Sequence, residues 1–456
     1  MLSPSASLAS TSPSASFASP FLSASFFCKA SELLEALKGA DALRKSAPDS
    51  FGLLGASVFL SDSRSGLCVE AFHCYGMGAL LAWLPSGQAS GSFSLPLLPL
   101  LSFVKATKGK GTVAFSEGKL SASVSGASLS LSAGPCWEAH PDQNESHRKE
   151  AYCLASLASA ELPADSRGFA LSPFLLASRF ASTDQSRQAL TGAGFYGESF
   201  YGTDGFSLRK APASLPAFPK ASAFPAEAWL PSWLSPIVEA FAKPAERESL
   251  LAFYFPEKRG AQALRFWTKA GLCVALRFPA SPGSFPKCDQ LFPSLLPYFF
   301  KANAKAFLSA VESLLEGLKA SDGEPRIELF LDGRILEVEL SATLQKNVGT
   351  KARPELEDYG KQEATFRCEY VEAPTDPCFD DGFFDLPESQ QAMAKEKHWH
   401  QSRLLVNGRF LQKALKSFLQ EGESLSFKWK DGRSPLLLSA FTEGSKALIM
   451  PVQRRR

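Results

Sequence analysis

DQSRQALTGAGFYGESFYGTDGFSLRK, residues 184–210, carries the clearest structural signals in the chain. It predicts the end of a helix, a strand over Gln188–Phe195, a tight turn over Tyr196–Glu198, and a second strand that runs into Thr203-Asp204-Gly205. Glycine adopts positive φ without steric cost, so Asp-Gly after a run of aromatic and aliphatic residues is a strong turn signal. Read by itself, the stretch is a β-hairpin.

A second apolar motif, Leu448-Ile449-Met450-Pro451-Val452, lies near the C-terminus and is followed by Gln453 and three arginines. Aliphatic residues this close to a run of charge have little reason to serve a core alone. We therefore expect this segment to line a surface site.

Both motifs resemble those of the bacterial DNA sliding clamp, the beta subunit of DNA polymerase III. That family carries D-x-x-R-x-x-L-x-G and then T-D-G-x-x-L at about the same distance. The matching residues are Asp184, Arg187, Leu190, Gly192, Thr203, Asp204, Gly205 and Leu208. The terminal segment is similar to the family's V-M-P-M. Two separated matches in the same order are stronger evidence than either match alone.

Three further segments resemble the family. Leu53–Leu60 is similar to its I-L-G-x-L-x-L strand, and Phe285–Pro293 to the F-P-x-x-x-x-x-x-P segment that links its second and third domains. NGRFLQKAL, residues 407–415, resembles F-N-x-x-Y-L-x-x-A-L, with Val406 where Phe is usual. The resemblance covers roughly residues 28–456 and is thin in the first domain.

For the fold, the resemblance implies an α+β protein of three similar clamp domains. Each has amphipathic helices packed on antiparallel sheets, and two chains close head to tail as a dimeric ring. The expected parts are a disordered Ser/Ala/Pro-rich tail over 1–27 and clamp domains over 28–134, 135–293 (with the linker) and 294–456. An acidic insert is expected at about 371–397.

The residue pattern itself supports this organisation, because two amphipathic helices and several strands recur in three rounds of about 140 residues. The expected helices are Ser31–Leu43 (with Ser31 as N-cap), Leu97–Lys105, Leu171–Ala181, Leu230–Ala242, Ala302–Leu318 and Gly408–Leu419. The expected strands include Leu53–Leu60, Thr112–Phe115, Leu120–Leu131, Ser249–Phe255, Ala263–Thr268, Leu272–Phe278, Arg326–Leu331, Ser424–Lys430 and Pro435–Ala440.

Composition sets broad limits. A chain of 456 residues suggests two to four domains, and 45% hydrophobic with 21% charged residues is ordinary for a globular protein. A net charge of +2 gives no strong field toward nucleic acid, although a ring that encircles DNA needs little direct affinity. Nine cysteines without a Cys-x-x-Cys indicate neither a zinc site nor a disulfide framework.

In the resembled family, a groove between the second and third domains takes a short hydrophobic peptide from polymerases, the clamp loader and repair proteins. The corresponding lining residues are Leu190, Thr203, Gly205, Phe206, Leu208, Pro293, Leu448, Ile449, Met450, Pro451 and Val452. Ser207 stands where the family usually has Arg, and Val452 replaces Met. These two departures bear on peptide affinity and selectivity.

A clamp also presents helix-borne Lys and Arg to DNA phosphates, without reading bases. The expected DNA-facing residues are Arg44, Lys45, Lys105, Arg179, Arg187, Lys243, Lys305, Arg409 and Lys413. Glu239, Glu312 and Glu316 lie among them, so we expect weak contact.

The sequence contains no recognisable catalytic motif. No Walker A loop, nucleophile elbow or His-Glu-x-x-His occurs, so we expect no enzyme, no cofactor and no metal. His398 and His400 beside the acidic insert leave a metal-dependent hydrolase as a lesser alternative. A divergent clamp-fold protein with altered partners is another.

The resemblance implies a sliding clamp, a processivity factor of DNA replication that encircles duplex DNA and tethers the replicative polymerase. Its expected partners are double-stranded DNA, DNA polymerase and clamp-loader subunits bound through a hydrophobic peptide motif, and a second copy of itself. The expected location is the cytoplasm, at the nucleoid, without a membrane partner.

Overall fold

The computed structural model describes residues 25–46, 57–63, 66–72, 79–91, 93–124, 126–131, 168–213, 227–242, 251–256, 261–279, 283–294, 296–318, 324–332, 335–347, 356–372, 401–419, 421–440 and 444–452. The chain forms two compact units. The first comprises Met1–Ala160 with Thr268–Leu276, and the second comprises Glu161–Trp267 with Arg277–Arg456. The architecture is α+β, as expected, with antiparallel strand pairing in both units.

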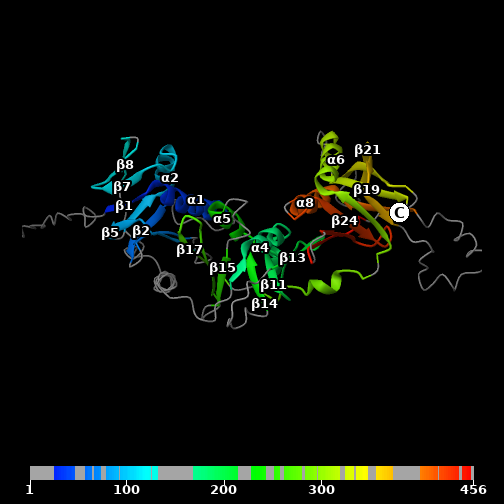
Figure 1. Cartoon of the computed structure of the whole chain (residues 1–456), viewed down its shortest axis with the longest axis horizontal. Helices are drawn as coiled ribbons and strands as arrows, with labels where there is room; N and C mark the ends of the chain where they lie inside the picture. The colour runs from blue at the N-terminus through cyan, green and yellow to red at the C-terminus, as the bar shows by residue number, and fades with distance from the viewer. Residues whose placement is uncertain are drawn as a thin grey trace, which may run out of the picture. The chain divides into compact units, whose positions relative to one another are not determined.

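One local motif recurs, a strand that runs into a helix (Figure 1). The pairs are β1 (Ser25–Lys29) with α1 (Ala30–Ser46), β6 (Phe93–Pro96) with α2 (Leu97–Ala106), β10 (Gly168–Ala170) with α4 (Leu171–Ser178), β14 (Glu227–Pro231) with α5 (Leu234–Phe241), β18 (Tyr298–Asn303) with α6 (Ala304–Gly317), and β23 (Gln401–Asn407) with α8 (Gly408–Phe418). The helices pack in pairs, α1 on α2, α4 on α5 and α6 on α8, which matches the three predicted rounds.

The first unit places α1 and α2 against two sheets. One sheet has the order β5-β1-β7-β8-β9, and the other contains the run β4-β3-β2-β6. The remaining strands are β2 (Ser57–Ser63), β3 (Gly66–Phe72), β4 (Ala79–Leu84), β5 (Gln88–Ser90), β7 (Thr112–Ser116), β8 (Lys119–Ala122) and β9 (Ser128–Ser130). Phe93 stacks on Phe115 with ring centroids 5.4 Å apart, and both are buried.

The second unit is built on a nine-stranded sheet with the order β14-β11-β12-β13-β26-β25-β24-β18-β22. Its strands are β11 (Gly192–Tyr196), β12 (Ser199–Thr203), β13 (Ser207–Pro212), β22 (Tyr370–Glu372), β24 (Ser424–Trp429), β25 (Leu436–Ala440) and β26 (Lys446–Ile449). A four-stranded sheet joins β23 to β19 (Glu324–Asp332), β20 (Glu337–Asn347) and β21 (Leu356–Arg367). Further strands are β15 (Leu251–Pro256) and β16 (Ala261–Trp267), of which β15 pairs with β10 and β16. Strand β17 (Cys273–Pro279) begins in the part of the chain that belongs to the first unit, which ends at Leu276.

The large core of the second unit crosses the predicted boundary at residue 293. Phe300 and Phe427 stack in it with centroids 4.4 Å apart. Phe180, which follows α4 in the predicted second domain, is fully buried in the same cluster. Burying one such side chain contributes about 1.5–3 kcal/mol, so this contact ties α4 to the core beneath α6 and α8.

The predicted helices are all present, but several boundaries are wrong. Gln188–Leu190 belongs to the 3₁₀ helix η3 (Gln185–Leu190), so β11 begins only at Gly192. Asp184 explains this, because its side chain caps η3 by accepting a hydrogen bond from Ser186 N at 2.9 Å. Leu230 lies in β14 and not in α5.

Four smaller boundary predictions also differ from the structure. Ser31 lies inside α1 and is not its N-cap. The predicted strand Leu120–Leu131 is two strands, β8 and β9, with Gly126 at φ 61° between them. Ser25–Phe27 belong to β1 and overlap the predicted tail, and Val371 and Glu372 belong to β22 and overlap the predicted insert. The rest of the tail and of the insert lies outside the described residues.

The tight turn predicted over Tyr196–Glu198 is present but shorter, since Tyr196 belongs to β11 and only Gly197 and Glu198 form the turn. Both residues have positive φ, 54° and 62°, the geometry of the tight hairpin turns that match strand twist. None of the described helices is long and apolar enough to cross a membrane.

Candidate functional site

The two sequence motifs meet in space at the pairing of β13 with β26. Leu208 lies opposite Leu448, and Ser207 opposite Ile449. The contact continues past the strand, because Met450 N donates to Phe206 O at 2.9 Å. The terminal segment then reaches β23, where Val452 N donates to Leu405 O at 2.8 Å. The second unit therefore joins its two halves through one continuous sheet.

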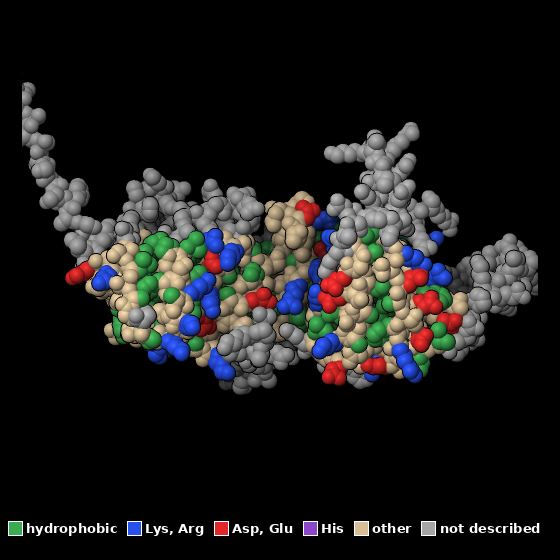
Figure 2. All heavy atoms as spheres, turned by 90° about the horizontal axis from the view of Figure 1, so that it is seen from above, with side chains coloured by type: hydrophobic (Ala, Val, Ile, Leu, Met, Phe, Trp, Pro, Cys, Tyr) green, Lys and Arg blue, Asp and Glu red, His purple; other side chains and the backbone are tan. Residues whose placement is uncertain are grey.

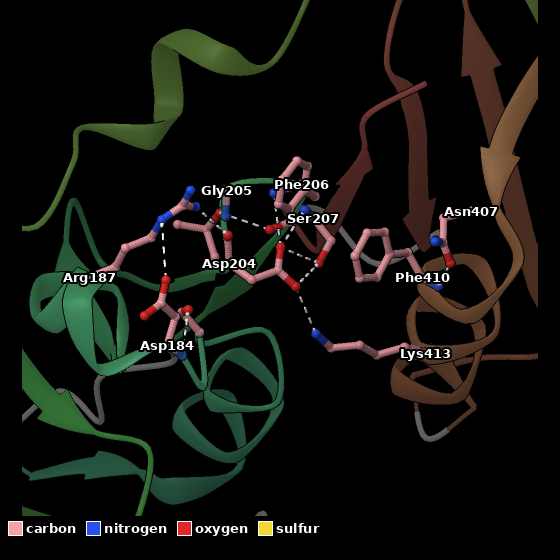
Figure 3. Close-up of polar contacts among 11 residues, drawn as sticks. Asp184, Arg187, Asp204, Gly205, Phe206, Ser207, Asn407, Phe410 and Lys413 are labelled. Carbon is pink, nitrogen blue, oxygen red and sulfur yellow. Dashed lines mark hydrogen bonds and ion pairs between the residues drawn. The ribbon is translucent and has the colours of Figure 1, made fainter. Parts of the chain in front are cut away.

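The Thr203–Ser207 turn is held by its own side chains (Figure 3). Asp204 Oδ1 accepts from Phe206 N at 2.9 Å and from Ser207 N at 2.7 Å. Thr203 Oγ1 donates to Ser207 O at 2.8 Å and accepts from Gly205 N at 3.0 Å. Gly205 has φ 90°, which a side chain rarely allows. Thr, Asp and Gly are thus each required by the geometry of the turn.

Arg187 ties η3 to this turn. Its Nη1 donates to Asp204 O at 3.3 Å, and its Nε lies 3.8 Å from Asp184 Oδ2 (Figure 3). A Cβ on Gly205 would come within 2.9 Å of Arg187 Nη1. The spacing of the D-x-x-R and T-D-G motifs therefore has a structural cause, since the arginine packs against the glycine and bonds the turn.

The apolar floor of the site lies on one face of the sheet. Leu208 and Leu448 are each 4% exposed and cluster with Tyr201, Cys288 and Leu437. Three side chains of the linker pack against this cluster: Phe285, Phe292 and Leu296.

The linker is anchored beside the floor. Asp289 Oδ1 accepts from Tyr201 Oη and from Lys210 Nζ, both at 2.7 Å. Burial acts to raise the pKa of the Asp289 carboxyl, but the hydrogen bonds from Lys210 and Tyr201 outweigh it and hold that pKa below its usual range. Phe285 covers Gly194, where a Cβ would meet its ring at 2.4 Å. Burial also raises the pKa of the Cys288 thiol to about 11, so this thiol is not an activated nucleophile.

Two exposed apolar side chains stand above the floor, Phe206 at 56% and Met450 at 47% exposure. Phe206 stacks on Phe410 of α8, with centroids 6.2 Å apart and an interplanar angle of 12°. Of the other predicted lining residues, Thr203 is buried and Leu190, Pro293, Pro451 and Val452 are half-buried. Ile449 packs in the core on the opposite sheet face, so it supports the site from behind.

Sequence reasoning missed Phe410, Asn407 and Lys413 as neighbours of this site. Asn407 caps α8, its Oδ1 accepting from Arg409 N at 2.9 Å. Lys413 Nζ lies 3.2 Å from Asp204 Oδ2 and 4.7 Å from the centroid of the Phe180 ring (Figure 3). A signal existed for Phe410, which takes the Tyr position of F-N-x-x-Y-L. No local signal linked Lys413 to Asp204.

Ser207, the residue that departs from the family's Arg, has a definite role. Its Oγ lies 2.9 Å from Asp204 Oδ2, the same oxygen that Lys413 approaches. The serine therefore joins the turn network and is 2% exposed, so it presents no charge at the surface of the site.

The predicted DNA-facing residues differ in their surroundings. Arg44 and Lys45 lie at 2.8 and 2.7 Å from Asp41, and Arg179 lies 3.3 Å from Glu239. Arg187 and Lys413 are engaged with the turn, as described above. Lys105, Lys305 and Arg409 are exposed and form no ion pair within the described part of the chain, and Lys243 lies outside it.

The alternative of a metal-dependent hydrolase depends on residues that the structure does not describe. His398 and His400 lie outside them. Within the described ranges, no group of three or more His, Cys, Asp or Glu side chains could hold a metal ion.

No protein-family model matches the chain, and no curated protein matches its sequence. Solved structures do match its fold over nearly the whole length. The sliding clamp of Bacillus subtilis has a TM-score of 0.64 at 14% identity, covering 95% of this chain and 100% of its own. The DNA polymerase III beta subunit of Pseudomonas aeruginosa gives 0.61 at 14%, covering 94% and 100%. The Helicobacter pylori beta clamp bound to a DNA ligase peptide gives 0.60 at 12%, covering 94% and 100%. The chain therefore has the fold of the bacterial DNA sliding clamp, the beta subunit of DNA polymerase III.

Proposed function

We propose that this protein is a DNA sliding clamp without catalytic activity of its own, which holds a replicative polymerase on duplex DNA. One observation carries the proposal. The pairing of β13 with β26 places exposed Phe206 and Met450 above the apolar pair Leu208 and Leu448. Because the motifs that mark clamps in the sequence meet at this point, the fold and the motifs support the same function.

The site suits a short hydrophobic peptide. A surface that exposes an aromatic ring and a flexible methionine over a packed apolar floor can accept aliphatic and aromatic anchors. A solved relative of the same fold, the Helicobacter pylori clamp, is bound to a DNA ligase peptide. We infer that polymerase and clamp-loader subunits bind here through such a segment, in the cytoplasm at the nucleoid.

A labelled peptide of the type Gln-Leu-x-Leu-Phe, titrated by fluorescence anisotropy, tests the groove. We expect saturable binding that weakens at least about tenfold, or about 1.4 kcal/mol, in Phe206→Glu, because a central aromatic contact is lost and a charge is desolvated. Removal of residues 450–456, which leaves β26 intact, should have a similar effect.

Tyr370→Glu is the matched control, since Tyr370 is an aromatic residue of β22 with 49% exposure outside the site. Equal losses in both Glu variants would show a non-specific charge effect and count against the groove. Absence of binding to the unmodified chain would favour a clamp-fold protein with altered partners.

The ring is tested separately. We propose a head-to-tail dimer, so light scattering should give about twice the 49.2 kDa of one chain. A monomer at micromolar concentration would contradict a closed two-chain ring.

A further inference from the structure

The exposed positions of helix α1 carry two lysines and no acid. They are Ser31, Lys38 and Lys45, spaced seven residues apart and therefore on one face of the helix. The acids of α1 are turned away from this line, since Glu32 and Asp41 are buried and Glu35 is half-buried.

The turn after α2 extends this line beyond the start of α1. Ala30 N donates to Gly111 O at 3.0 Å, and a Cβ on Gly109 would lie 3.6 Å from Ser31 Cα. The turn therefore abuts the first turn of α1, and it carries exposed Lys108 and Lys110. Lys105, in the last turn of α2, is exposed next to it, and α2 contains no acidic residue.

These residues form what we call the basic face of α1 and α2: Lys38, Arg44, Lys45, Lys105, Lys108 and Lys110. Figure 2 shows Lys and Arg side chains gathered over the helices of the first unit. At 1.5 Å per residue, the face extends about 21 Å from the level of Ser31 to Lys45. A DNA duplex presents about one phosphate charge per 1.7 Å of its axis, so several phosphates lie within that length.

Most of the positive charge on the basic face of α1 and α2 has no acidic partner among the described residues. Arg44 and Lys45 share the buried carboxylate of Asp41. Lys38, Lys105, Lys108 and Lys110 form no ion pair with any described residue. The helices of the second unit differ in degree. Arg179, Lys413 and Lys416 are paired with Glu239, Asp204 and Glu312 at 3.3, 3.2 and 2.9 Å. Lys305 of α6 and Arg409 of α8 are exposed and form no ion pair with any described residue.

We infer that the chain contacts the phosphates of duplex DNA chiefly through the basic face of α1 and α2, and that the helices of the second unit contribute less. This inference rests on the proposed clamp function. It assigns the electrostatic contact between the clamp and DNA phosphates mainly to the helices of the first unit. Side chains as long and mobile as lysine suit sequence-independent contact, since they follow phosphates without fixing a register.

The test is the salt dependence of binding to a labelled linear DNA duplex by the full chain. In a variant with Lys38, Lys105, Lys108 and Lys110 replaced by Gln, we expect the slope of log K against log salt to become shallower by about 3–4, at about 0.9 per lost phosphate contact. Between 50 and 200 mM salt, the unmodified chain should lose about 100-fold more affinity than this variant.

Two further variants keep the assignment open to refutation. Replacement of Lys287, Lys301, Lys361 and Lys428 by Gln removes the same net charge from parts of the second unit outside its α-helices and should leave the slope within about one. Replacement of Arg179, Lys305 and Arg409 by Gln tests the helices of that unit and should change the slope by no more than about two, at about 0.9 for each of the two cations without an ion pair. Equal changes in all variants would overturn the inference, and so would an unchanged slope in the first.

The thermal midpoints of all variants should coincide, which separates lost contact from lost fold. A first-unit variant that loses affinity for anionic phosphatidylserine vesicles but keeps its affinity for DNA would assign the face to membranes and overturn the inference.

Peptide binding distinguishes the two proposals. If the unmodified chain binds the peptide but no duplex, only this inference fails; if it binds duplex but no peptide, the polymerase tether fails.

Discussion

The helices of the two units differ in how many of their basic side chains have an acidic partner. In the first unit, Lys38 and Lys105 project into solvent without an acidic partner among the described residues. In the second unit, Lys413 pairs with Asp204 across the β13–β26 junction. Arg209 on β13 is fully buried there, paired with Glu421 and lying 3.7 Å from the centroid of the Phe418 ring. The first unit thus leaves Lys38 and Lys105 available to a partner. In the second unit Lys413 and Arg209 help to hold the fold, while Lys305 and Arg409 remain exposed.

The physical basis of this difference is the position of the acids. A cation keeps its hydration when no carboxylate lies within about 4 Å, and such a residue contributes little to stability. A buried cation has lost that hydration, so its acid partner becomes essential. The comparison therefore predicts that single substitutions unfold the second unit more readily than they unfold the first.

The largest expected effect comes from Glu421→Gln. The substitution would leave the Arg209 guanidinium buried without its counter-ion, which typically costs about 3–5 kcal/mol. Nε and Nη1 of Arg209 find no hydrogen-bond partner among the described residues, so Glu421 and Ser445 provide the hydrogen bonds that compensate the guanidinium there. Thermal unfolding followed by circular dichroism should show a markedly lower midpoint.

A double substitution provides the control. Arg209→Met with Glu421→Met removes both charges and keeps apolar volume, so it should restore most of the lost stability, since buried ion pairs are often replaceable by packed apolar groups. If Glu421→Gln alone left the midpoint unchanged, the second unit would not depend on this pair, and the contrast between the units would disappear.

This pair also marks the limit of what the sequence could predict. Strands, helices and the Thr203-Asp204-Gly205 turn were predictable because their signals are local: a period, a cap, a glycine. Arg209 lies in a strand segment that shows no sign of a buried charge, and its partner is 212 residues away. The pairing of Leu208 with Leu448 could be anticipated only through motifs, because no periodicity indicates that these two residues would lie opposite each other. Ile449 was expected to line the site but packs in the core, because a motif does not show which residues of a strand face the core.

The Lys413–Asp204 pair should have an intermediate effect. Both side chains are partly buried, at 30% and 16% exposure, and they connect α8 to the Thr203–Ser207 turn. We expect Lys413→Met to lower the free energy of unfolding by about 1 kcal/mol. A double-mutant cycle with Asp204→Asn should give a coupling energy of similar size. A coupling energy near zero would show that Lys413, like the unpaired cations of the first unit, contributes little to stability. This result would weaken the comparison between the units.

The smallest effect belongs to Asp41, the one acid that binds cations on the basic face of α1 and α2. Burial acts to raise the pKa of its carboxyl, but hydrogen bonds from Lys45 and Arg44 outweigh it, so the pKa in the folded chain lies below its ordinary value. A depressed carboxyl pKa stabilises the fold above the unfolded value, about 3.9, and this contribution is lost as pH falls through the folded value. Asp41→Asn should therefore cost a few tenths of a kcal/mol at pH 7 and nothing once the carboxyl is protonated.

Asp41→Asn also bears on the comparison itself, because it removes one negative charge and releases Arg44 and Lys45 without adding a cation. The thermal midpoints of the variant and the unmodified chain should converge below about pH 4. At pH 7, the variant should bind duplex DNA more tightly, by about two- to threefold at low salt, and with a steeper salt dependence. A variant that loses stability at pH 7 without gaining DNA affinity would show that the cations near Asp41 serve the helix alone. The basic face would then be confined to Lys38, Lys105, Lys108 and Lys110, and the difference between the units would rest on those four residues.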